Sequence, residues 1–226
     1  MKNIILATTI VLCLGLIGCT EVNNEPIVIN YSPSEGGDHI GCNISDVLIK
    51  SDLIVVTEVY GVDKPDDPSV PLSIKRHITE VLQGSINAKE VRLNNHYDKC
   101  ILFLRKEGDS YVLTTEEVDF FDASVIWFDI PYIDESFYYK DDIRLLLDAY
   151  NNNKDLFSKA GKQGLFQLWT QLQGGQYIKS RFLLDVDYLV DEQDIPMLLE
   201  WKQMETNMHV IFQIESIIQR LEGRGE

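Results

Sequence analysis

The stretch "SDLIVVTEVY", residues 51–60, is the strongest indication of the fold in this chain. From Leu53 to Tyr60 it is a run of mostly β-branched residues of strand length, and Val, Ile and Thr are the residues that best fit the pleated surface of a sheet. A short helix is expected directly before it, at residues 45–50. The segment "GVDKPDDPSVP", residues 61–71, has the Gly, Pro and Asp content of a loop. The stretch therefore predicts a strand between a helix and a loop.

Further strands are expected on the C-terminal side of that loop. In residues 72–84 alternate positions are polar, which is the period of a strand with one solvent-facing side, and Gly84 ends the pattern. A shorter strand is expected at residues 90–93, followed by a hairpin in "CILFLRKEGDSYVLTT" with its turn near Gly108. More β-like sequence runs from residue 118 to 133. Several short strands at this spacing predict a small barrel or sandwich.

From residue 138 onward the apolar period changes to that of helices. Apolar residues recur at i, i+3, i+4 and i+7 in two stretches, residues 143–150 and 165–172, and helical spacing continues through residues 182–189. Asp194 is expected to cap a helix that has Pro196 in its first turn, and Asn207 is expected to cap the last helix. These last two helices are predicted to form an antiparallel pair.

The two periods predict an α+β protein, with a small antiparallel β-barrel followed by an all-helical C-terminal unit. The expected divisions are a signal peptide at residues 1–18, a tether at 19–41, a β-barrel domain at 42–133 and a helical domain at 134–226. The tether is assigned by its content of Asn, Glu, Pro, Ser and Gly, although "IVI" at residues 27–29 interrupts it.

The N-terminus has the layout of a secretory signal. Lys2 is followed by an uncharged run at residues 4–17, which is shorter than the roughly 20 residues that a membrane-spanning helix needs. Gly18 directly precedes Cys19, and "LIGC" at residues 16–19 resembles the lipobox of bacterial lipoproteins. That resemblance implies cleavage before Cys19 and a lipid on its sulfur. The alternative is an ordinary signal cut elsewhere, with Cys19 uninvolved.

The resemblance also implies a location. Because Thr20 rather than Asp follows the cysteine, lipoprotein sorting in bacteria with two membranes would place the protein in the outer membrane. A host with a single membrane is the alternative. In either case the chain is expected in the cell envelope, held on the membrane by the lipid.

The net charge argues against binding of nucleic acid, and the number of cysteines indicates a disulfide. Removing Lys2 with the signal takes the formal net charge from −16 to −17, and so acidic a surface repels nucleic acid. Cys42 and Cys100 remain once Cys13 is removed and Cys19 is acylated. In an exported protein this even remainder predicts a Cys42–Cys100 disulfide, with two separate buried thiols as the alternative.

The order "SDLIVVTEV", "SIKRHITEVLQG", "KEVRL" and "CILFLRKEGDSYVL" is similar to that of netrin-like domains and their bacterial relatives. The resemblance covers residues 45–113 and implies a five-stranded barrel of the OB type. Cys42 and Cys100 roughly match the positions of a cysteine bridge in that family. Its protease inhibitors chelate zinc through a free N-terminal cysteine, which an acylated Cys19 would not provide. The C-terminal helix pair is similar to HEAT-type repeats, although one or two pairs establish no repeat period.

The sequence contains no motif that predicts catalysis. It lacks G-x-S-x-G, H-E-x-x-H, P-loop and G-x-G-x-x-G patterns, and no cofactor or metal is expected. The dispersed histidines are His39, His77, His96 and His209. The acidic segment at residues 185–194 does not have the ligand spacing of an EF-hand and is expected to be solvated helix surface followed by a cap.

We therefore expect a lipid-anchored envelope protein that acts as a non-catalytic binding module, with an unidentified protein partner and no nucleic acid. The alternatives are an envelope hydrolase whose site forms only in the fold and a netrin-like protease inhibitor that uses another edge of the barrel.

Overall fold

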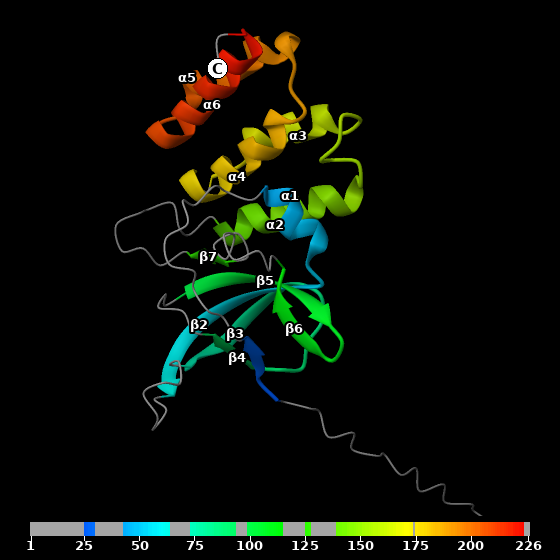
Figure 1. Ribbon diagram of the computed structural model, residues 1–226, viewed down its shortest axis with the longest axis vertical. Helices are drawn as coiled ribbons and strands as arrows, with labels where there is room; N and C mark the ends of the chain where they lie inside the picture. The colour runs from blue at the N-terminus through cyan, green and yellow to red at the C-terminus, as the bar shows by residue number, and fades with distance from the viewer. Residues whose placement is uncertain are drawn as a thin grey trace, which may run out of the picture.

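The computed structural model describes residues 25–29, 43–63, 73–93, 99–114, 125–127, 139–173 and 175–223 (Figure 1). In these ranges the barrel lies at one end of the long axis, and the helices are stacked beyond it in layers. The layer nearest the barrel contains α1 and α2, the next contains α3 and α4, and the outermost contains α5 and α6.

Strand β2 (Leu53–Asp63), which contains the predicted β-branched run, lies in the middle of the sheet. It pairs antiparallel with β3 (Ser73–Gln83) on one side and with β5 (Lys99–Glu107) on the other. Beyond β3 lies β4 (Glu90–Leu93), and β5 pairs with both β6 (Ser110–Leu113) and β7 (Val125–Trp127). The strands predicted at residues 53–60, 72–84 and 90–93 and the β5–β6 hairpin are confirmed. Of the β-like sequence predicted at residues 118–133, β7 is the part that lies within the described residues. Gly108 has a φ of 60° in the hairpin turn, a conformation that glycine adopts without strain.

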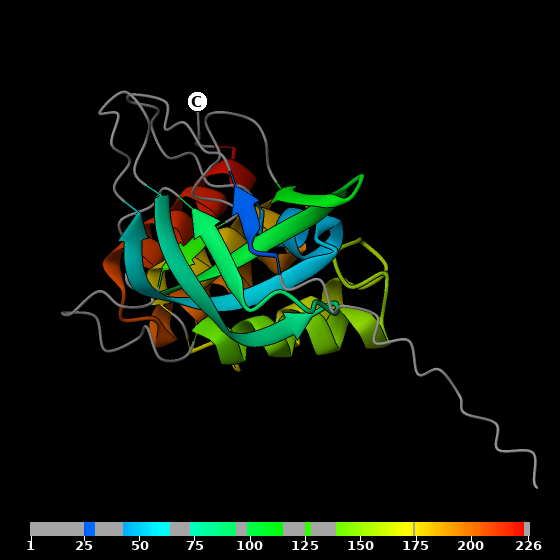
Figure 2. The same ribbon diagram turned by 90° about the horizontal axis from the view of Figure 1, so that it is seen from below.

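The barrel is mixed, so the prediction of an antiparallel barrel is wrong in this respect. Strand β1 (Ile27–Ile29) pairs in parallel with β4, and the order β1-β4-β3-β2-β5-β6 brings β1 close to β6 in a nearly closed six-strand barrel (Figure 2). β1 lies within the range expected to be a tether. It joins the sheet because Ile27 and Ile29 are buried in the barrel core, where they are removed from water.

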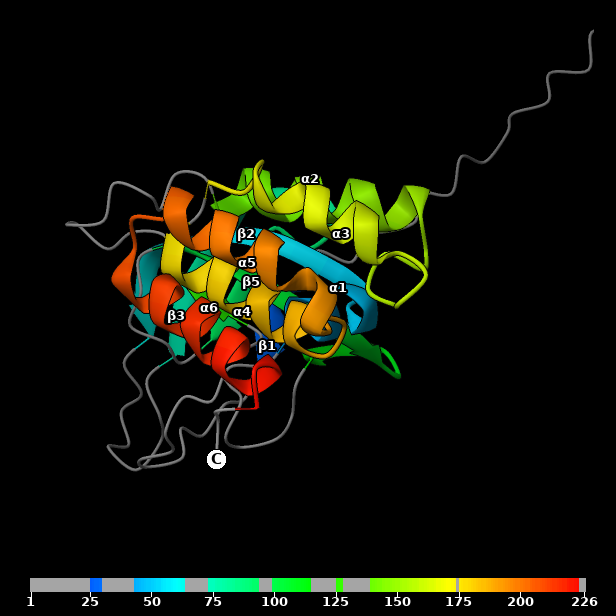
Figure 3. The ribbon, with the colours of Figure 1, turned by 90° about the horizontal axis from the view of Figure 1, so that it is seen from above.

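Six helices are described, and their bounds are α1 (Ile44–Lys50), α2 (Tyr139–Asn152), α3 (Lys162–Trp169), α4 (Gly175–Asp187), α5 (Ile195–Met204) and α6 (Met208–Leu221). Figure 3 shows α4, α5 and α6 lying over the sheet, with α2 and α3 beside them. None of these helices is both long and apolar enough to be a membrane span. The predicted helices after residue 138 are therefore present as α2 to α6, and α1 joins the same stack from the N-terminal side of the barrel.

Two hydrophobic cores meet at the sheet. Alternate residues of β2 and β5 face opposite ways, as the pleat requires. Leu53 and Leu102 are in the barrel core, whereas Ile54 and Phe103 are in the core shared with the helices. The barrel and the helical stack therefore share two strands and do not pack as separate bodies.

The two predicted helix caps have different outcomes. Asn207 caps α6 by accepting hydrogen bonds from the backbone N–H groups of His209 and Val210, as expected. Asp194 makes no side-chain cap to α5, because it lies in the 3-10 turn η3 (Glu192–Asp194) and accepts instead from the backbone N–H of Asp191. The Asp191 side chain in turn caps η3, so the actual cap lies three residues earlier than predicted.

Candidate functional site

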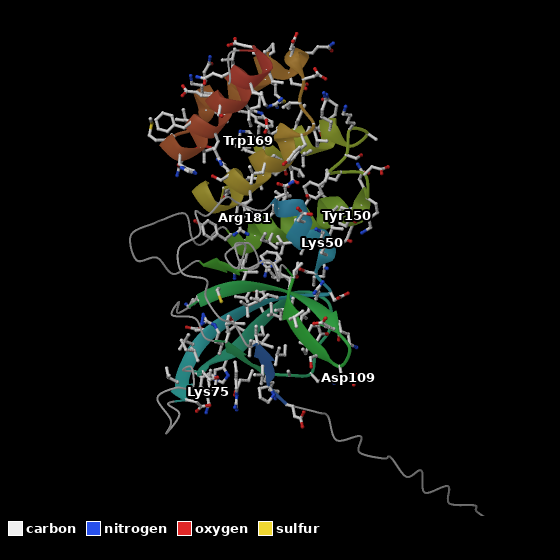
Figure 4. The ribbon with its side chains drawn as sticks, in the orientation of Figure 1. Lys50, Lys75, Asp109, Tyr150, Trp169 and Arg181 are labelled. Atoms are coloured by element: carbon white, nitrogen blue, oxygen red, sulfur yellow. The ribbon has the colours of Figure 1, made fainter. Side chains whose placement is uncertain are left out.

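The outward face of β2, β3 and β4 carries a polar network on which the sheet register brings distant residues together. Because paired residues on neighbouring strands point to the same face, Glu58, His77 and Glu90 form one outward row across the three strands. Lys75 on β3 and Arg92 on β4 form the next row. Figure 4 shows Lys75 on the barrel, at the end of the molecule away from α5 and α6.

Tyr60 lies on this face because it is two residues from Glu58 on β2, next to an irregularity of the strand. The β2–β3 register shifts between Val59 and Gly61, so Tyr60 has no directly paired residue on β3. Such bulges change the direction in which a side chain points. The Tyr60 ring stacks on the His77 ring with centroids 3.8 Å apart and an interplanar angle of 10°. Even so, Tyr60 remains 45% exposed, which leaves it accessible to a ligand.

Hydrogen bonds hold the polar atoms of this face in place. The Tyr60 hydroxyl donates to Oε2 of Glu90, and Nε of Arg92 donates to Oε1 of the same carboxylate over 2.7 Å. The bond between Tyr60 and Glu90 lowers the pKa of the Glu90 carboxyl and raises the pKa of the Tyr60 phenol. Both shifts favour a neutral phenol donating to an ionised carboxylate.

The cations of the face are paired within it. Lys75 Nζ lies 2.6 Å from a carboxylate oxygen of Asp63, and Lys99 Nζ lies 3.5 Å from Glu58. Each such exposed pair contributes only about 0–1 kcal/mol to stability, because water screens it. Their effect is to order the side chains and to leave this face nearly neutral in an otherwise acidic protein. We call the set Glu58, Tyr60, Asp63, Lys75, His77, Glu90, Arg92 and Lys99 the outer-face network.

An open concavity of about 630 Å³ adjoins the outer-face network. It is lined by residues 78–81 of β3 and by residues 86–89, which lead into β4. The two walls are joined where the Ile78 backbone N–H donates to the Lys89 carbonyl over 2.9 Å. Since His77 and Glu90 are the next residues on these walls, the concavity and the network form one continuous surface.

A second polar group lies inside the barrel. Nε of the fully buried Arg76 is 3.1 Å from Oγ1 of Thr57, which in turn lies 3.2 Å from Sγ of Cys100. Burial raises the pKa of the Cys100 thiol. A buried, protonated thiol is a poor nucleophile, so this group is not a candidate catalytic site.

The structure places the predicted site residues as follows. Cys19 and Cys42 lie outside the described residues, as do His39 and His96. Cys100 has a free thiol, and its pairing with Cys42 stays a prediction because the partner is not described. Among the described residues no group of three or more His, Cys, Asp or Glu side chains could hold a metal ion.

The acidic segment at residues 185–194 differs from the expectation of solvated helix surface. Asp185 is buried and accepts hydrogen bonds from Ser45 on α1. Asp187 pairs with Arg220 over 2.6 Å, and Lys162 pairs with Asp194 over 2.8 Å. These three carboxylates therefore tie α4 and η3 to other helices.

Sequence reasoning placed His77 on a solvent-facing strand position but missed the residues that surround it. Polar residues at alternate positions of β3 indicated that His77 faces solvent. No local pattern indicates that Tyr60 meets Glu90, because the β2–β3 and β3–β4 registers together bring the two residues to the same place. No family model, no curated protein and no solved structure matches this chain.

Proposed function

We propose that this chain is a lipid-anchored cell-envelope protein that acts by binding a protein partner through the outer-face network. The observation that carries the proposal is the exposed Tyr60–His77 stack, held by Glu90 and Arg92 beside an open concavity. Tyr and Arg are enriched at protein interfaces, and side chains that are ordered before binding lose less entropy on association.

The anchor is supported by the "LIGC" motif at residues 16–19 and by the position of β1. Only five residues lie between Cys19 and Glu25, so this part of the chain can span at most about 20 Å. β1 lies in the barrel, at the opposite end of the molecule from α5 and α6 (Figure 1). An anchored protein would therefore hold its barrel near the membrane and its outermost helices away from it.

Replacing Cys19 tests the anchor. Cells fed a clickable palmitate should label the wild-type chain and leave Cys19→Ala unlabelled, because the acyl chains attach at this residue. The variant should also move from the membrane fraction to the soluble fraction or keep its uncleaved signal. Cys13→Ala is the matched control and should label like the wild type. Equal labelling of the wild type and Cys19→Ala would rule the anchor out.

Site-specific cross-linking tests the binding surface. A photo-crosslinking amino acid in place of Lys89 should produce a discrete protein adduct in intact cells, because this exposed residue lines the concavity beside Glu90 and its replacement leaves the Tyr60–His77 stack in place. The matched control is the same amino acid in place of Asp109, an exposed residue in the β5–β6 turn (Figure 4). We expect at least fivefold less adduct at the control position. No adduct, or equal adducts at both positions, would contradict the proposed surface.

A hydrolase is the second candidate, because Tyr60 brings a histidine and a carboxylate together. His77 and Glu90 both contact Tyr60, beside a concavity that could receive a substrate. The chain from Thr20 onward can be assayed with esterase, phosphatase, glycosidase and protease substrates. Turnover that is lost in both His77→Ala and Glu90→Gln would replace the binding proposal with this one.

A further inference from the structure

A row of large apolar side chains lies exposed around the turn between α5 and α6. Met204 ends α5 and is 53% exposed, while Met208 and Phe212 on α6 are each 59% exposed. Met208 and Phe212 are four residues apart and so lie on the same side of α6. Leu199 on α5 is also exposed, but it lies five positions before Met204 and therefore on another side of that helix. We call Met204, Met208 and Phe212 the tip patch.

These side chains are not needed for the protein's own core. α5 already buries Leu198 and Trp201, and α6 buries Val210, Ile214, Ile217 and Ile218. The tip patch is therefore a second apolar surface on a helix pair whose inner side is already packed. Exposed apolar patches of this kind mark interaction sites, and methionine is common at surfaces that accommodate a partner.

The turn that carries the tip patch is held rigidly. The side chain of Glu205 is only 5% exposed and pairs with Lys179 on α4 over 2.7 Å. Its other oxygen accepts hydrogen bonds from the backbone N–H groups of Thr206 and Asn207, and Asn207 caps α6. The patch is therefore ordered before any partner binds, which reduces the entropy lost on association.

The charge around the tip patch indicates whether the partner is positively or negatively charged. Residues 195–223 contain four carboxylates and two lysine or arginine side chains, and two of the carboxylates, Glu205 and Glu215, are paired with Lys179 and Lys202. Lys202 pairs with Glu215 over 2.6 Å and Arg220 pairs with Asp187, so both cations are already engaged. Glu200, exposed beside Leu199, makes no ion pair with any residue in the described ranges. A second copy, with its own net charge of −16, would be repelled, whereas a cationic partner would be attracted.

The backbone of α5 and α6 indicates which secondary structure the partner has. The N–H and C=O groups within these helices are hydrogen-bonded internally, so an extended peptide would find no backbone partners at the tip patch. A helix brings its own backbone hydrogen bonds and needs only side-chain contacts. We infer that the tip patch is a docking site for a cationic amphipathic helix of another protein. If the chain is anchored as proposed above, the patch faces away from the membrane, and the inference otherwise does not depend on the anchor.

Methionine methyl NMR tests the inference directly. The chain from Thr20 onward contains Met197, Met204 and Met208, and every described residue follows Cys19. The probe is a synthetic 18-residue Leu/Lys amphipathic helix. We expect the methyl signals of Met204 and Met208 to shift on titration, while that of Met197, which packs against the core, stays in place. Phe212→Ser and Met208→Ser should each weaken binding at least tenfold.

Tyr188→Ser is the matched control, because Tyr188 is 75% exposed and is not part of the tip patch. It should bind within twofold of the wild type, and all three variants should keep the wild-type melting temperature. A Ser/Lys peptide of equal charge should bind at least tenfold more weakly. Equal binding of that peptide, or no binding of the Leu/Lys peptide, would overturn the inference. So would a dimer lost in Phe212→Ser, or a shift of the same methyl signals by phosphatidylcholine vesicles, because these results would assign the patch to a second copy or to lipid.

Discussion

The free energy of unfolding is expected to fall between about pH 4 and pH 7 because of Asp185, and Asp185→Asn should remove this contribution. Asp185 lies on α4 and is 5% exposed. The backbone N–H of Ser45, in the first turn of α1, donates to its Oδ2 over 3.0 Å, and the Ser45 hydroxyl donates to Oδ1. Burial, together with the nearby Asp46 carboxylate, raises the pKa of Asp185 from 3.8 to about 7, although both hydrogen bonds oppose this rise.

The direction of the effect follows from proton linkage. Between pH 4 and 7 the folded state keeps the Asp185 proton while the unfolded state loses it, so raising the pH favours unfolding. The stabilisation is fully present below the unfolded pKa and is lost as the pH rises through about 7. A shift of this size corresponds to about 4 kcal/mol over the whole range.

Urea unfolding at several pH values between 4 and 8 measures this contribution. Asp185→Asn keeps the shape of the side chain and an oxygen that can accept from Ser45, so it should fold. Relative to the wild type it should gain stability as the pH rises, by up to about 4 kcal/mol at pH 7 and above. Asp109→Asn, in the exposed turn between β5 and β6, is the control: it removes a carboxylate far from Ser45 and Asp185, so the slope due to Asp185 should remain. Parallel pH profiles for the wild type and Asp185→Asn would show that Asp185 titrates normally in the folded state.

Trp201→Ala should lower the free energy of unfolding by about 3–5 kcal/mol, which is the usual cost of truncating a buried Trp. Trp201 is 3% exposed, and its ring stacks on Trp169 with centroids 4.6 Å apart. It also meets Phe166 edge-on at 5.6 Å, so one side chain joins α5 to α3. Removing it would leave a cavity in the middle of the helical stack, where Figure 4 places Trp169.

Urea unfolding of the variant, followed by circular dichroism, provides the measurement. Trp201→Phe should lose clearly less stability than Trp201→Ala, because a smaller ring still fills part of the space. Leu199→Ala, on the exposed side of the same helix, is the matched control and should cost under about 1 kcal/mol. A loss below about 1 kcal/mol for Trp201→Ala would mean that the aromatic cluster contributes little to stability.

The element types were predictable because they depend on neighbouring residues. The β-branched run at residues 53–60 became the N-terminal part of β2, and the segment at residues 90–93 became β4 with the predicted bounds. The helical spacings at residues 143–150 and 165–172 fall largely within α2 and α3. In each case the spacing of the apolar residues depends only on that segment of the sequence. It indicates the type of element and which of its sides faces a core.

The incorrect predictions concern segments whose structure depends on distant residues. "IVI" at residues 27–29 is too short to be recognised as a strand without β4 beside it. Asp194 has the sequence context of a helix cap, yet Asp191 takes that role three residues earlier in η3. Asp185 looks like one of several surface carboxylates until α1 packs on α4 and buries it.

The sequence by itself determined where most of the strands and helices lie and that the net charge is acidic, and it is the basis for the prediction that Cys19 carries a lipid. The tertiary structure alone decided which residues meet. Asp185 and Ser45 are 140 residues apart, and Tyr60 reaches Glu90 across 30 residues through a bulge and two strand pairings. The physical reason is that periodicity is set by the residues of one element, whereas register, bulges and helix packing are set jointly by all the elements that share a core.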